Sequence, residues 1–317
     1  MNLCDSPPET LAAQDFAAVL ARIQDDVRPL IGQGKVADYI PMLAGVPIER
    51  FGMALTTLDG GLFQVGDAEQ AFSIQSISKV FTLTLALEAI GGDLWRRVGR
   101  EPSGNPFNSL VQLEHECGIP RNPFINAGAH VVADVVLSSG DRARERLLEF
   151  VRERADNPGI QMDPEVAQSE HETGFRNAAL AHFLRSFGNL DNPVEAVLDF
   201  YYHQCALRMS CVDLARSLLY LAHNGRCIRR ADPVISPERA KRINALMLTC
   251  GTYDAAGDFA FHVGLPVKSG VGGGMVAVVP NVAALAVWSP GLDDKGNSVV
   301  GSAALSRFTE LTGLSVF

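Results

Sequence analysis

The order in which two kinds of periodicity follow each other constrains the fold of this chain more than any other feature. Residues 51–67 predict two strands around an Asp59-Gly60 turn, and short apolar β-like runs return after Cys250. Between them, from Ser76 to about Leu248, apolar residues recur mostly at helical intervals. We therefore expect strands from both ends of the chain to share one sheet, with a helical segment inserted between them.

The same pattern gives approximate element boundaries. Sequential hairpins favour an antiparallel sheet, covered by the first and last helices. The β-like runs after Cys250 are FAFHVGLPVKSG, GGMVAVVP and VAALAVWSP. Helices are expected over residues 10–33, 76–90, 126–138, 141–154, 176–187, 193–206, 211–224, 236–249 and 298–312.

These elements predict an α/β (α+β) fold in two parts. Residues 1–75 and 250–317 form a discontinuous sheet domain, and residues 76–249 form an all-helical domain. A cleft between two such parts is the usual place for a binding or catalytic site.

Charge and hydropathy exclude several classes of partner. The net charge is -9, whereas nucleic acids and anionic membranes are bound by basic surfaces. The N-terminal stretch MNLCDSPPETLAAQD has neither a basic nor an apolar region, so we expect no signal peptide. The most apolar stretch, GMVAVVPNVAALAVW, is interrupted by Pro280 and Asn281 and is too short to span a bilayer. A cytoplasmic protein is expected.

The cysteines and histidines do not predict a metal site. None of the six cysteines forms a C-x-x-C pair, which favours free thiols in a reducing compartment. The seven histidines show no metal-ligand spacing such as H-E-x-x-H. We predict no metal and no cofactor.

The stretch FSIQSISKVF places Ser76 three residues before Lys79, where a helical pattern begins. At this spacing both side chains lie on the same helix face, and a buried lysine loses its proton readily enough to act as a base. The alternative is that Ser76 caps the helix and Lys79 is solvated.

A second candidate element is LPVKSGVGGGMVAVVP. Lys268, Ser269 and Gly270 open a glycine-rich passage before an apolar strand, where backbone can approach a substrate closely. They are a possible cleft wall, and a backbone N–H here together with that of Ser76 can form an oxyanion hole. The alternative is a tight turn or bulge.

S-x-x-K early and K-[ST]-G late, on either side of a helical insertion, is the arrangement of the serine β-lactamases and penicillin-binding proteins. This order indicates acyl transfer to a serine. It does not select the substrate.

Further motifs resemble the serine-dependent glutaminases from about residue 33 to residue 310. The motifs are GKVADYIPML, EPSGNPFNS, NPFINAGAH, QSEHETGFRN, LDFYYHQCA and CGTYDAAGDFAFHVGLPVKSGVGGG. The resemblance implies the β-lactamase/transpeptidase-like fold, in agreement with the periodicity. It also implies a homo-oligomer, either a dimer or a tetramer.

Carried over by position, the resemblance implies that Ser76 is the nucleophile, with Lys79 and Tyr253 assisting. The backbone N–H groups of Ser76 and Val271 would form the oxyanion hole. The implied substrate-binding positions are spread along the chain: Tyr39, Gln75, Asn126, Glu170, Asn177, Tyr201, Tyr253 and Val271.

These residue types suit free glutamine. Glu170 can pair with the α-ammonium, while asparagine and tyrosine side chains can bind the α-carboxylate or the ammonium. We therefore expect hydrolysis of L-glutamine to L-glutamate and ammonia through a γ-glutamyl-enzyme. Two alternatives stay open: another serine hydrolase of this fold, such as a β-lactamase or esterase, and a non-catalytic glutamine sensor.

Overall fold

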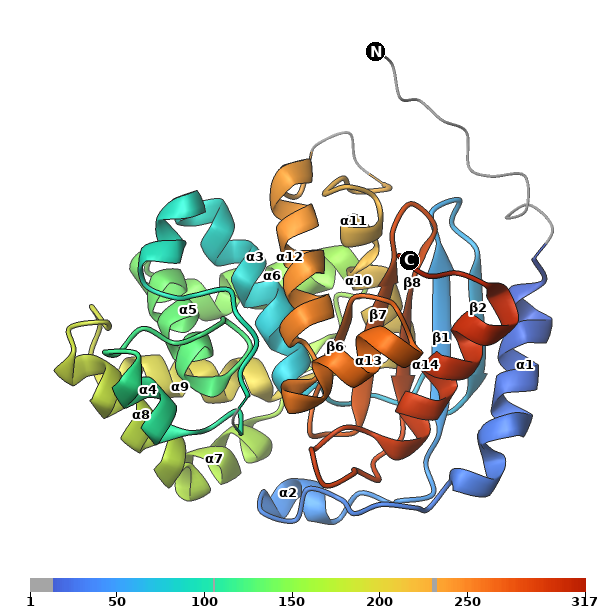
Figure 1. The fold of residues 1–317 in the computed structure, drawn as a ribbon, viewed down its shortest axis with the longest axis horizontal. Coiled ribbons are helices and arrows are strands. Elements are labelled where there is room, and N and C mark those ends of the chain that lie inside the picture. Colours follow the sequence, from blue (N-terminus) through green and yellow to red (C-terminus); the bar gives the residue numbers. More distant parts are fainter. Residues whose placement is uncertain (1–13, 105, 230–232) are drawn as a thin grey trace.

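The computed structural model describes residues 14–104, 106–229 and 233–317. Within them, the central sheet has five antiparallel strands in the order β2-β1-β8-β7-β6 (Figure 1). Because β1 pairs with β8, the two ends of the chain share this sheet as predicted. The strands are β1 (Gly52–Thr57), β2 (Leu62–Gly66), β6 (Val267–Ser269), β7 (Gly274–Val279) and β8 (Ala283–Trp288).

The remaining elements are mostly helical. A small second sheet has the order β3-β5-β4 and consists of β3 (Phe72–Ser73), β4 (Gln161–Met162) and β5 (Leu207–Met209). The α-helices are α1 (Phe16–Val27), α2 (Pro41–Ala44), α3 (Ser78–Ile90), α4 (Leu110–His115), α5 (Asn126–Ser138), α6 (Ala143–Ala155), α7 (Pro164–Thr173), α8 (Phe175–Ser186), α9 (Val194–Cys205), α10 (Cys211–Ser217), α11 (Leu219–Ala222), α12 (Pro237–Cys250), α13 (Ala256–His262) and α14 (Val299–Thr312). Four short 3-10 helices are η1 (Arg28–Leu30), η2 (Gln75–Ile77), η3 (Gly91–Arg96) and η4 (Tyr253–Ala255).

The predicted hairpin joins β1 to β2. Gly60 has φ +92°, a conformation that glycine adopts at little cost, and the Thr57 hydroxyl bonds the Asp59 carboxylate across the turn. Met53 pairs with Val65, and Leu55 pairs with Phe63. The Asp-Gly signal therefore predicts both the turn and the strands around it correctly.

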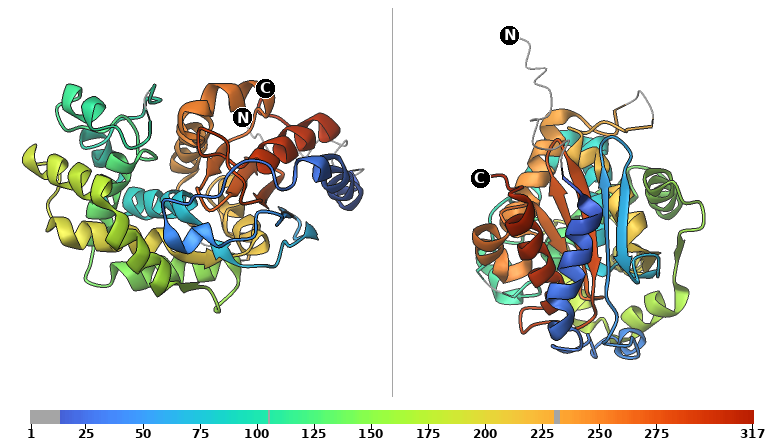
Figure 2. Two further views of the ribbon diagram at one scale, coloured as in Figure 1. Left: turned by 90° about the horizontal axis from the view of Figure 1, so that it is seen from below. Right: turned by 90° about the vertical axis from the view of Figure 1, so that its right-hand side faces the viewer.

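Helices cover both faces of the central sheet. α1 and α14 run side by side over one face (Figure 2), and α3 and α10 lie on the other. All residues of β1, β7 and β8 are buried, which explains why these strands read as continuous apolar runs. β2 is an edge strand and alternates between exposed and half-buried residues.

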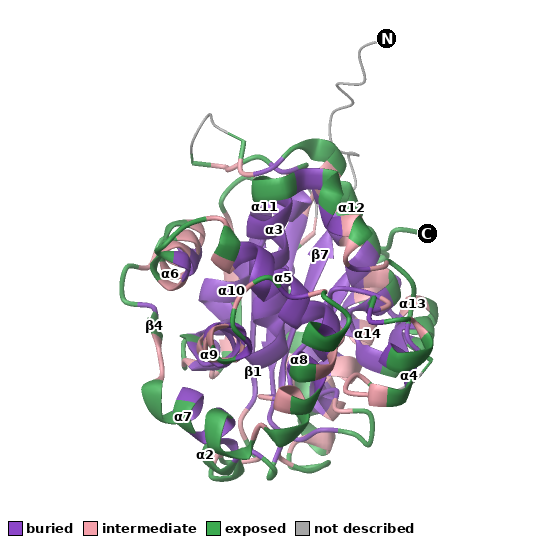
Figure 3. Cartoon of the chain, turned by 90° about the vertical axis from the view of Figure 1, so that its left-hand side faces the viewer, coloured by how far each residue is buried: buried purple, intermediate pink, exposed green. Residues whose placement is uncertain are grey.

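α3 is the central helix of the molecule, and its residues 78–87 are all buried. It packs against α5, α6 and α12, so an unbroken run of apolar and small polar residues replaces the usual amphipathic stripe. Figure 3 shows α3 and α5 as mostly buried, whereas α8 carries exposed residues. The chain's Ser76–Lys79 motif is thereby placed deep in the structure.

Three predicted elements differ from those observed. α1 ends at Val27 because Pro29 follows within η1, and residues 10–13 of the expected helix lie outside the described residues. The expected helix over residues 211–224 is divided at Leu218 into α10 and α11. The prediction of a β-like run from Phe259 is wrong for its first half, which is the helix α13; only Val267–Ser269 is a strand.

Candidate active site

A cavity of about 310 Å³ gathers most of the predicted site residues. It contains Ser76 and all but one of the implied substrate-binding positions. Its lining residues are Tyr39, Ile40, Gln75, Ser76, Phe107, Asn108, Asn126, Glu170, Thr173, Gly174, Arg176, Asn177, Tyr201 and Val271. The exception, Tyr253, is buried beside Val271 in one apolar cluster.

Ser76 lies in η2, immediately before α3. Gln75 precedes it with φ +51°, an uncommon conformation for a residue with a side chain and one that is frequent at functional sites. Neither η2 nor α3 has a side-chain cap, so the alternative that Ser76 caps the helix does not hold. The neighbouring Ser78 hydroxyl instead donates to the carbonyl of Gln75.

The glycine-rich passage packs against the backbone that leads into Ser76. A Cβ atom on Gly270 would lie 2.5 Å from the carbonyl oxygen of Ile74, and one on Gly272 would lie 2.3 Å from that of Ser73. Both distances are too short for any side chain, so glycine is required at both positions. We call this contact between residues 270–272 and residues 73–76 the glycine seam. It brings Val271 to the cavity beside Ser76.

Lys79 is fully buried one helical turn beyond Ser76. Its Nζ donates to the carbonyl oxygen of Phe124 at 3.0 Å and to Asn126 Oδ1 at 2.8 Å. Burial lowers the pKa of Lys79 to about 8, although the Glu170 charge opposes this shift. Asn126 Nδ2 then donates to Asn177 Oδ1 at 2.9 Å, which links the amine to two predicted binding residues.

Glu170, on α7, is the buried carboxylate of the cavity. Burial raises the pKa of Glu170 to about 7, while the hydrogen bond from Gln75 and the charge of Lys79 lower it. Gln75 Nε2 lies 2.8 Å from Glu170 Oε1. A cation entering the cavity would hold this carboxylate in its charged form.

Two tyrosines flank the buried amines. The Lys79 Nζ lies 5.7 Å from the ring centroid of Tyr201. Tyr253 has φ +58°, and its Oη has no hydrogen bond of normal geometry among the described residues. Burial raises the pKa of Tyr253 to about 12, and the nearby hydroxyls of Ser76 and Ser269 lower it.

Lys268, Ser269 and Gly270 are buried behind the cavity and do not line it. The Lys268 Nζ donates to the carbonyl oxygen of Ser269 and lies 4.8 Å from the ring centroid of Tyr253. Burial, followed by the charge of Lys79, lowers the pKa of Lys268 far below its usual value. Of this passage, Val271 is the residue that reaches the cavity.

Several cavity residues have no role predicted from the sequence: Ile40, Phe107, Asn108, Thr173, Gly174 and Arg176. Ile40 and Arg176 adjoin assigned positions in the chain, but, apart from the Thr173 hydroxyl, none of the six residues carries a nucleophile or a base that would mark it. His130 was also missed. It is fully buried against Tyr201, with the ring centroids 4.6 Å apart, and neither of its ring nitrogens has a hydrogen-bond partner in the described structure.

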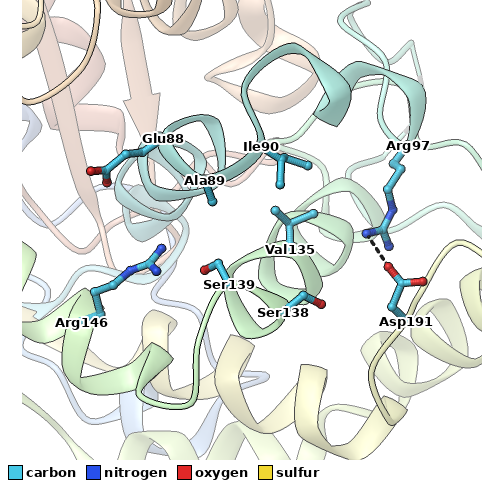
Figure 4. A pocket seen from close by; sticks show the side chains of 9 residues that line it. All are labelled: Glu88, Ala89, Ile90, Arg97, Val135, Ser138, Ser139, Arg146 and Asp191. Atoms are coloured by element: carbon cyan, nitrogen blue, oxygen red, sulfur yellow. Dashed lines mark hydrogen bonds and ion pairs between the residues drawn. The ribbon is translucent and has the colours of Figure 1, made fainter.

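A larger cavity of about 630 Å³ lies elsewhere, where α3, α5 and α6 meet (Figure 4). Glu88 and Arg146 lie at one end of it, and Arg97 pairs with Asp191 at the other. Its Ser139 hydroxyl is bonded to the carbonyl oxygen of Val136. Since no lysine lines it, the smaller cavity is the better candidate for serine chemistry.

The described residues contain neither a metal-binding cluster nor a membrane-spanning helix. No group of three or more His, Cys, Asp or Glu side chains is placed to hold a metal ion there. No helix in the described ranges is long and apolar enough to cross a membrane.

Comparison with known proteins identifies consistent relatives. A family model described as Glutaminase matches residues 34–317. A glutaminase of Rhizobium leguminosarum bv. trifolii is 60% identical over 306 residues, which cover 96% of this chain and 99% of that protein. A glutaminase of Yersinia pestis bv. Antiqua is 58% identical over 301 residues, covering 95% and 98%.

Solved structures give the same result. A probable glutaminase named ybaS superposes with a TM-score of 0.89 at 37% identity, over 95% of this chain and 99% of that one. A probable glutaminase from Bacillus subtilis, complexed with 6-diazo-5-oxo-L-norleucine, superposes with a TM-score of 0.86 at 34% identity, over 96% and 98%.

Proposed function

We propose that this chain, which belongs to the serine-dependent glutaminase family and hydrolyses L-glutamine to L-glutamate and ammonia, does so with Ser76 as its nucleophile. The predicted fold class is confirmed, because the superposed structures are glutaminases of this fold. One observation carries the proposal for Ser76: it opens onto the same cavity as Glu170 and Asn126, one turn before a buried amine.

Lys79 is the general base in this proposal. A neutral amine has two N–H donors and one lone pair, and the acceptors on Phe124 and Asn126 match the two donors. The lone pair is then free to accept the proton of Ser76. With a pKa of about 8, roughly one Lys79 in ten is neutral at pH 7, which suffices for a base that regains its form in each cycle.

Tyr253 returns the proton to the leaving nitrogen. Because the pKa of Tyr253 is about 12, its phenol stays protonated near neutral pH and acts as a donor. Ser76 Oγ attacks the side-chain amide carbon, and its proton passes to Lys79. The C–N bond then breaks as Tyr253 protonates the nitrogen, and Tyr253 regains a proton from Lys79. Ammonia and a γ-glutamyl ester of Ser76 result, and water cleaves the ester by the same groups in reverse.

Backbone donors support the tetrahedral intermediate. The glycine seam places Val271 beside Ser76, and the N–H of Val271 makes no backbone hydrogen bond within the described chain. The N–H groups of Ser76 and Val271 would together receive the oxyanion. In other acyl-transfer enzymes, removing one such donor slows turnover about 100- to 1000-fold.

The opposite end of the substrate binds through its charges. Glu170 pairs with the α-ammonium, and the amides of Asn126 and Asn177 with the hydroxyl of Tyr201 bind the remaining polar atoms. The Bacillus subtilis protein was solved with 6-diazo-5-oxo-L-norleucine, whose name describes the glutamine skeleton with a diazomethyl group in place of the amide nitrogen. This supports a pocket that accepts the same skeleton here.

We also propose the two-part division at residues 75/76 and 249/250, with the active site in the cleft between the parts. Cavity residues come from both parts: Tyr39 and Val271 from the sheet part, and Asn126 and Glu170 from the helical part. The small sheet crosses this boundary, because β3 pairs with β5.

We also propose that the protein is a homo-oligomer, either a dimer or a tetramer. We propose that it acts in the cytoplasm. Large apolar side chains are exposed on and near α4 and α8, among them Val111, Ile119 and Phe187, and such surfaces favour association. The five described cysteines form no disulfide, which suits a reducing compartment. Light scattering on the purified protein would measure the subunit number.

The decisive experiment compares ammonia release from L-glutamine by wild type, Ser76→Ala and Ser217→Ala. Ser217 is a matched control: it is fully buried on α10, and its hydroxyl donates to the carbonyl of Leu214, away from the cavity. We expect kcat to fall at least about 1000-fold in Ser76→Ala and to stay at the wild-type value in Ser217→Ala.

Controls for this experiment are L-asparagine as substrate and the melting temperature of each variant. Ser76→Ala that is folded and still active would refute the nucleophile assignment. Wild type that gains stability with L-glutamine but releases no ammonia would instead support a sensor.

A further inference from the structure

Ser73 has no role in the proposal above, yet it lies three residues before the nucleophile. It is on β3, is 8% exposed and does not line the cavity. Its Oγ lies 3.0 Å from the carbonyl oxygen of Cys205, the last residue of α9. A carbonyl oxygen can only accept, so the Ser73 hydroxyl must donate its single proton to Cys205. Ser73 Oγ can then take part in any further hydrogen bond only as an acceptor.

That acceptor capacity determines the orientation of the Gln75 side chain. Gln75 Nε2 lies 2.9 Å from Ser73 Oγ and 2.8 Å from Glu170 Oε1. Ser73 has already used its proton and a carboxylate has none, so both neighbours require a donor from Gln75. Two independent contacts therefore place the NH₂ group of the amide on this side.

The amide oxygen of Gln75 is consequently left for the cavity. Both N–H groups of Gln75 are used, its Oε1 has no hydrogen-bond partner among the described residues, and Gln75 lines the cavity. Beside it lies the carboxylate of Glu170. This part of the wall presents acceptors, which is what an ammonium group with three donors and no acceptor requires.

We propose that Ser73 is a positioning residue that fixes the Gln75 amide so that its Oε1 and the Glu170 carboxylate form an acceptor pair for the α-ammonium of the substrate. The proposal rests on glutamine as the substrate. It gives the enzyme a reason to reject γ-amides that lack the α-amino group, because they would leave both acceptors unpaired. The order of hydrogen bonds runs from Cys205 through Ser73 and Gln75 to Glu170.

The opposite amide orientation shows what Ser73 prevents. A flipped Gln75 would direct its NH₂ group toward the substrate ammonium and its oxygen toward both Ser73 Oγ and the Glu170 carboxylate. Donor would then face donor, and acceptor would face acceptor. Without the Ser73 hydroxyl, Glu170 alone opposes this flip, and Gln75 is less firmly held.

The test uses Ser73→Ala, Ser73→Thr and Ser73→Cys beside Ser217→Ala. KM and kcat are measured for L-glutamine, and the inhibition constant is measured for glutaramate, the same γ-amide without the α-amino group. For Ser73→Ala we expect KM for L-glutamine to rise about tenfold, the size of one lost hydrogen bond, with kcat within about twofold. The inhibition constant of glutaramate should stay unchanged, so that the preference for the ammonium falls about tenfold.

The other variants separate positioning from a general structural effect. Ser73→Thr keeps the hydroxyl on a strand residue and should restore the preference. Ser73→Cys, with its weak donor and acceptor, should be intermediate, and it keeps the test valid if the alanine variant does not fold. Loosening Gln75 should also move the acidic limb of kcat/KM to higher pH, because the Gln75 hydrogen bond lowers the pKa of Glu170.

An unchanged preference in folded Ser73→Ala and Ser73→Cys would overturn the proposal. Equal weakening of L-glutamine and glutaramate would also overturn it, since that result indicates a general distortion of the cavity. Wild type without activity on L-glutamine would refute the proposed function itself, which is a different outcome.

Discussion

The two faces of the central sheet bury different chemistry. On the face toward α1 and α14, the buried side chains are mostly apolar, and Phe16 stacks on Phe308 there. On the face toward α3, the protein buries two lysines, Lys79 and Lys268, and a histidine, His130. The first face gains stability mainly from apolar packing, whereas the second holds ionisable groups away from water and shifts their pKa values.

We therefore expect stability to depend mainly on the face toward α1 and α14, and activity on the face toward α3. Removing apolar area from the first face should lower stability without affecting the chemistry. Changing a buried polar group on the second face should alter binding or the pH response, and the change should cost little stability only where it leaves no buried partner unpaired. Substitutions of Phe308, Glu170 and His130 test this assignment.

Phe308→Ala should give the largest effect on stability. Phe308 is fully buried on α14, and its removal leaves a cavity between α14 and the sheet. We expect the free energy of unfolding to fall by about 3–5 kcal/mol, measured by denaturant titration. KM for L-glutamine in the folded fraction should match wild type. A raised KM would show that the two faces are coupled.

Glu170→Gln should act in the opposite way. The substitution keeps the size of the side chain but removes the charge that we propose pairs with the α-ammonium of the substrate. We expect kcat/KM for L-glutamine to fall about 10- to 100-fold, with a melting temperature equal to or above that of wild type, because a buried charge is removed. An unchanged kcat/KM would place the ammonium elsewhere in the cavity.

His130→Leu should give the smallest effect and a stabilising one. Both ring nitrogens are buried without partners, so an apolar side chain of similar size should raise the free energy of unfolding by about 1–2 kcal/mol at pH 7.5. His182→Leu, at an exposed position of α8, is the control and should leave stability nearly unchanged.

The pH response identifies the cause of that gain. Burial lowers the pKa of His130 to about 3, whereas an unfolded histidine titrates near 6.5. Below pH 6.5 the unfolded chain binds a proton that the folded chain does not, so wild type loses up to about 1.4 kcal/mol per pH unit from this group as pH falls. The advantage of His130→Leu should widen in acid. A constant difference between pH 7.5 and 5 would assign it to packing.

The sequence predicts a structural element well when the residues that determine it are close together in the chain. The turn at Asp59-Gly60 rests on neighbouring residues, so its sequence signal is sufficient. Residues 259–263 were wrongly predicted as β-like, because apolar residues alternate along FAFHV as they do in a strand. In the structure, however, Phe259 in α13 and Val263 just after it are buried one helical turn apart, while Phe261 between them is 84% exposed. A short apolar run does not distinguish the two periods.

The candidate site shows the same limit. The Ser76–Lys79 spacing and the resemblance predict the reactive groups, and the cavity brings Ser76 together with most of the implied substrate-binding positions. The role inferred for Ser73 could not be predicted from the sequence, because its hydroxyl bonds a carbonyl 132 positions away in the chain. The unpaired state of His130 likewise depends on what α9 brings against α5.

The glycine seam has a consequence for how such an enzyme can change. Backbone meets backbone there with no side chain between, so the spacing of the proposed nucleophile, Ser76, and the proposed oxyanion donor, Val271, is set by the dimensions of the peptide itself. Exchange of side chains offers no means of adjusting it. Divergence toward other amide substrates must then be sought in the part of the cavity wall that side chains form, as Thr173 and Arg176 do at the junction of α7 and α8. A library aimed at new selectivity would randomise that wall and leave the seam intact.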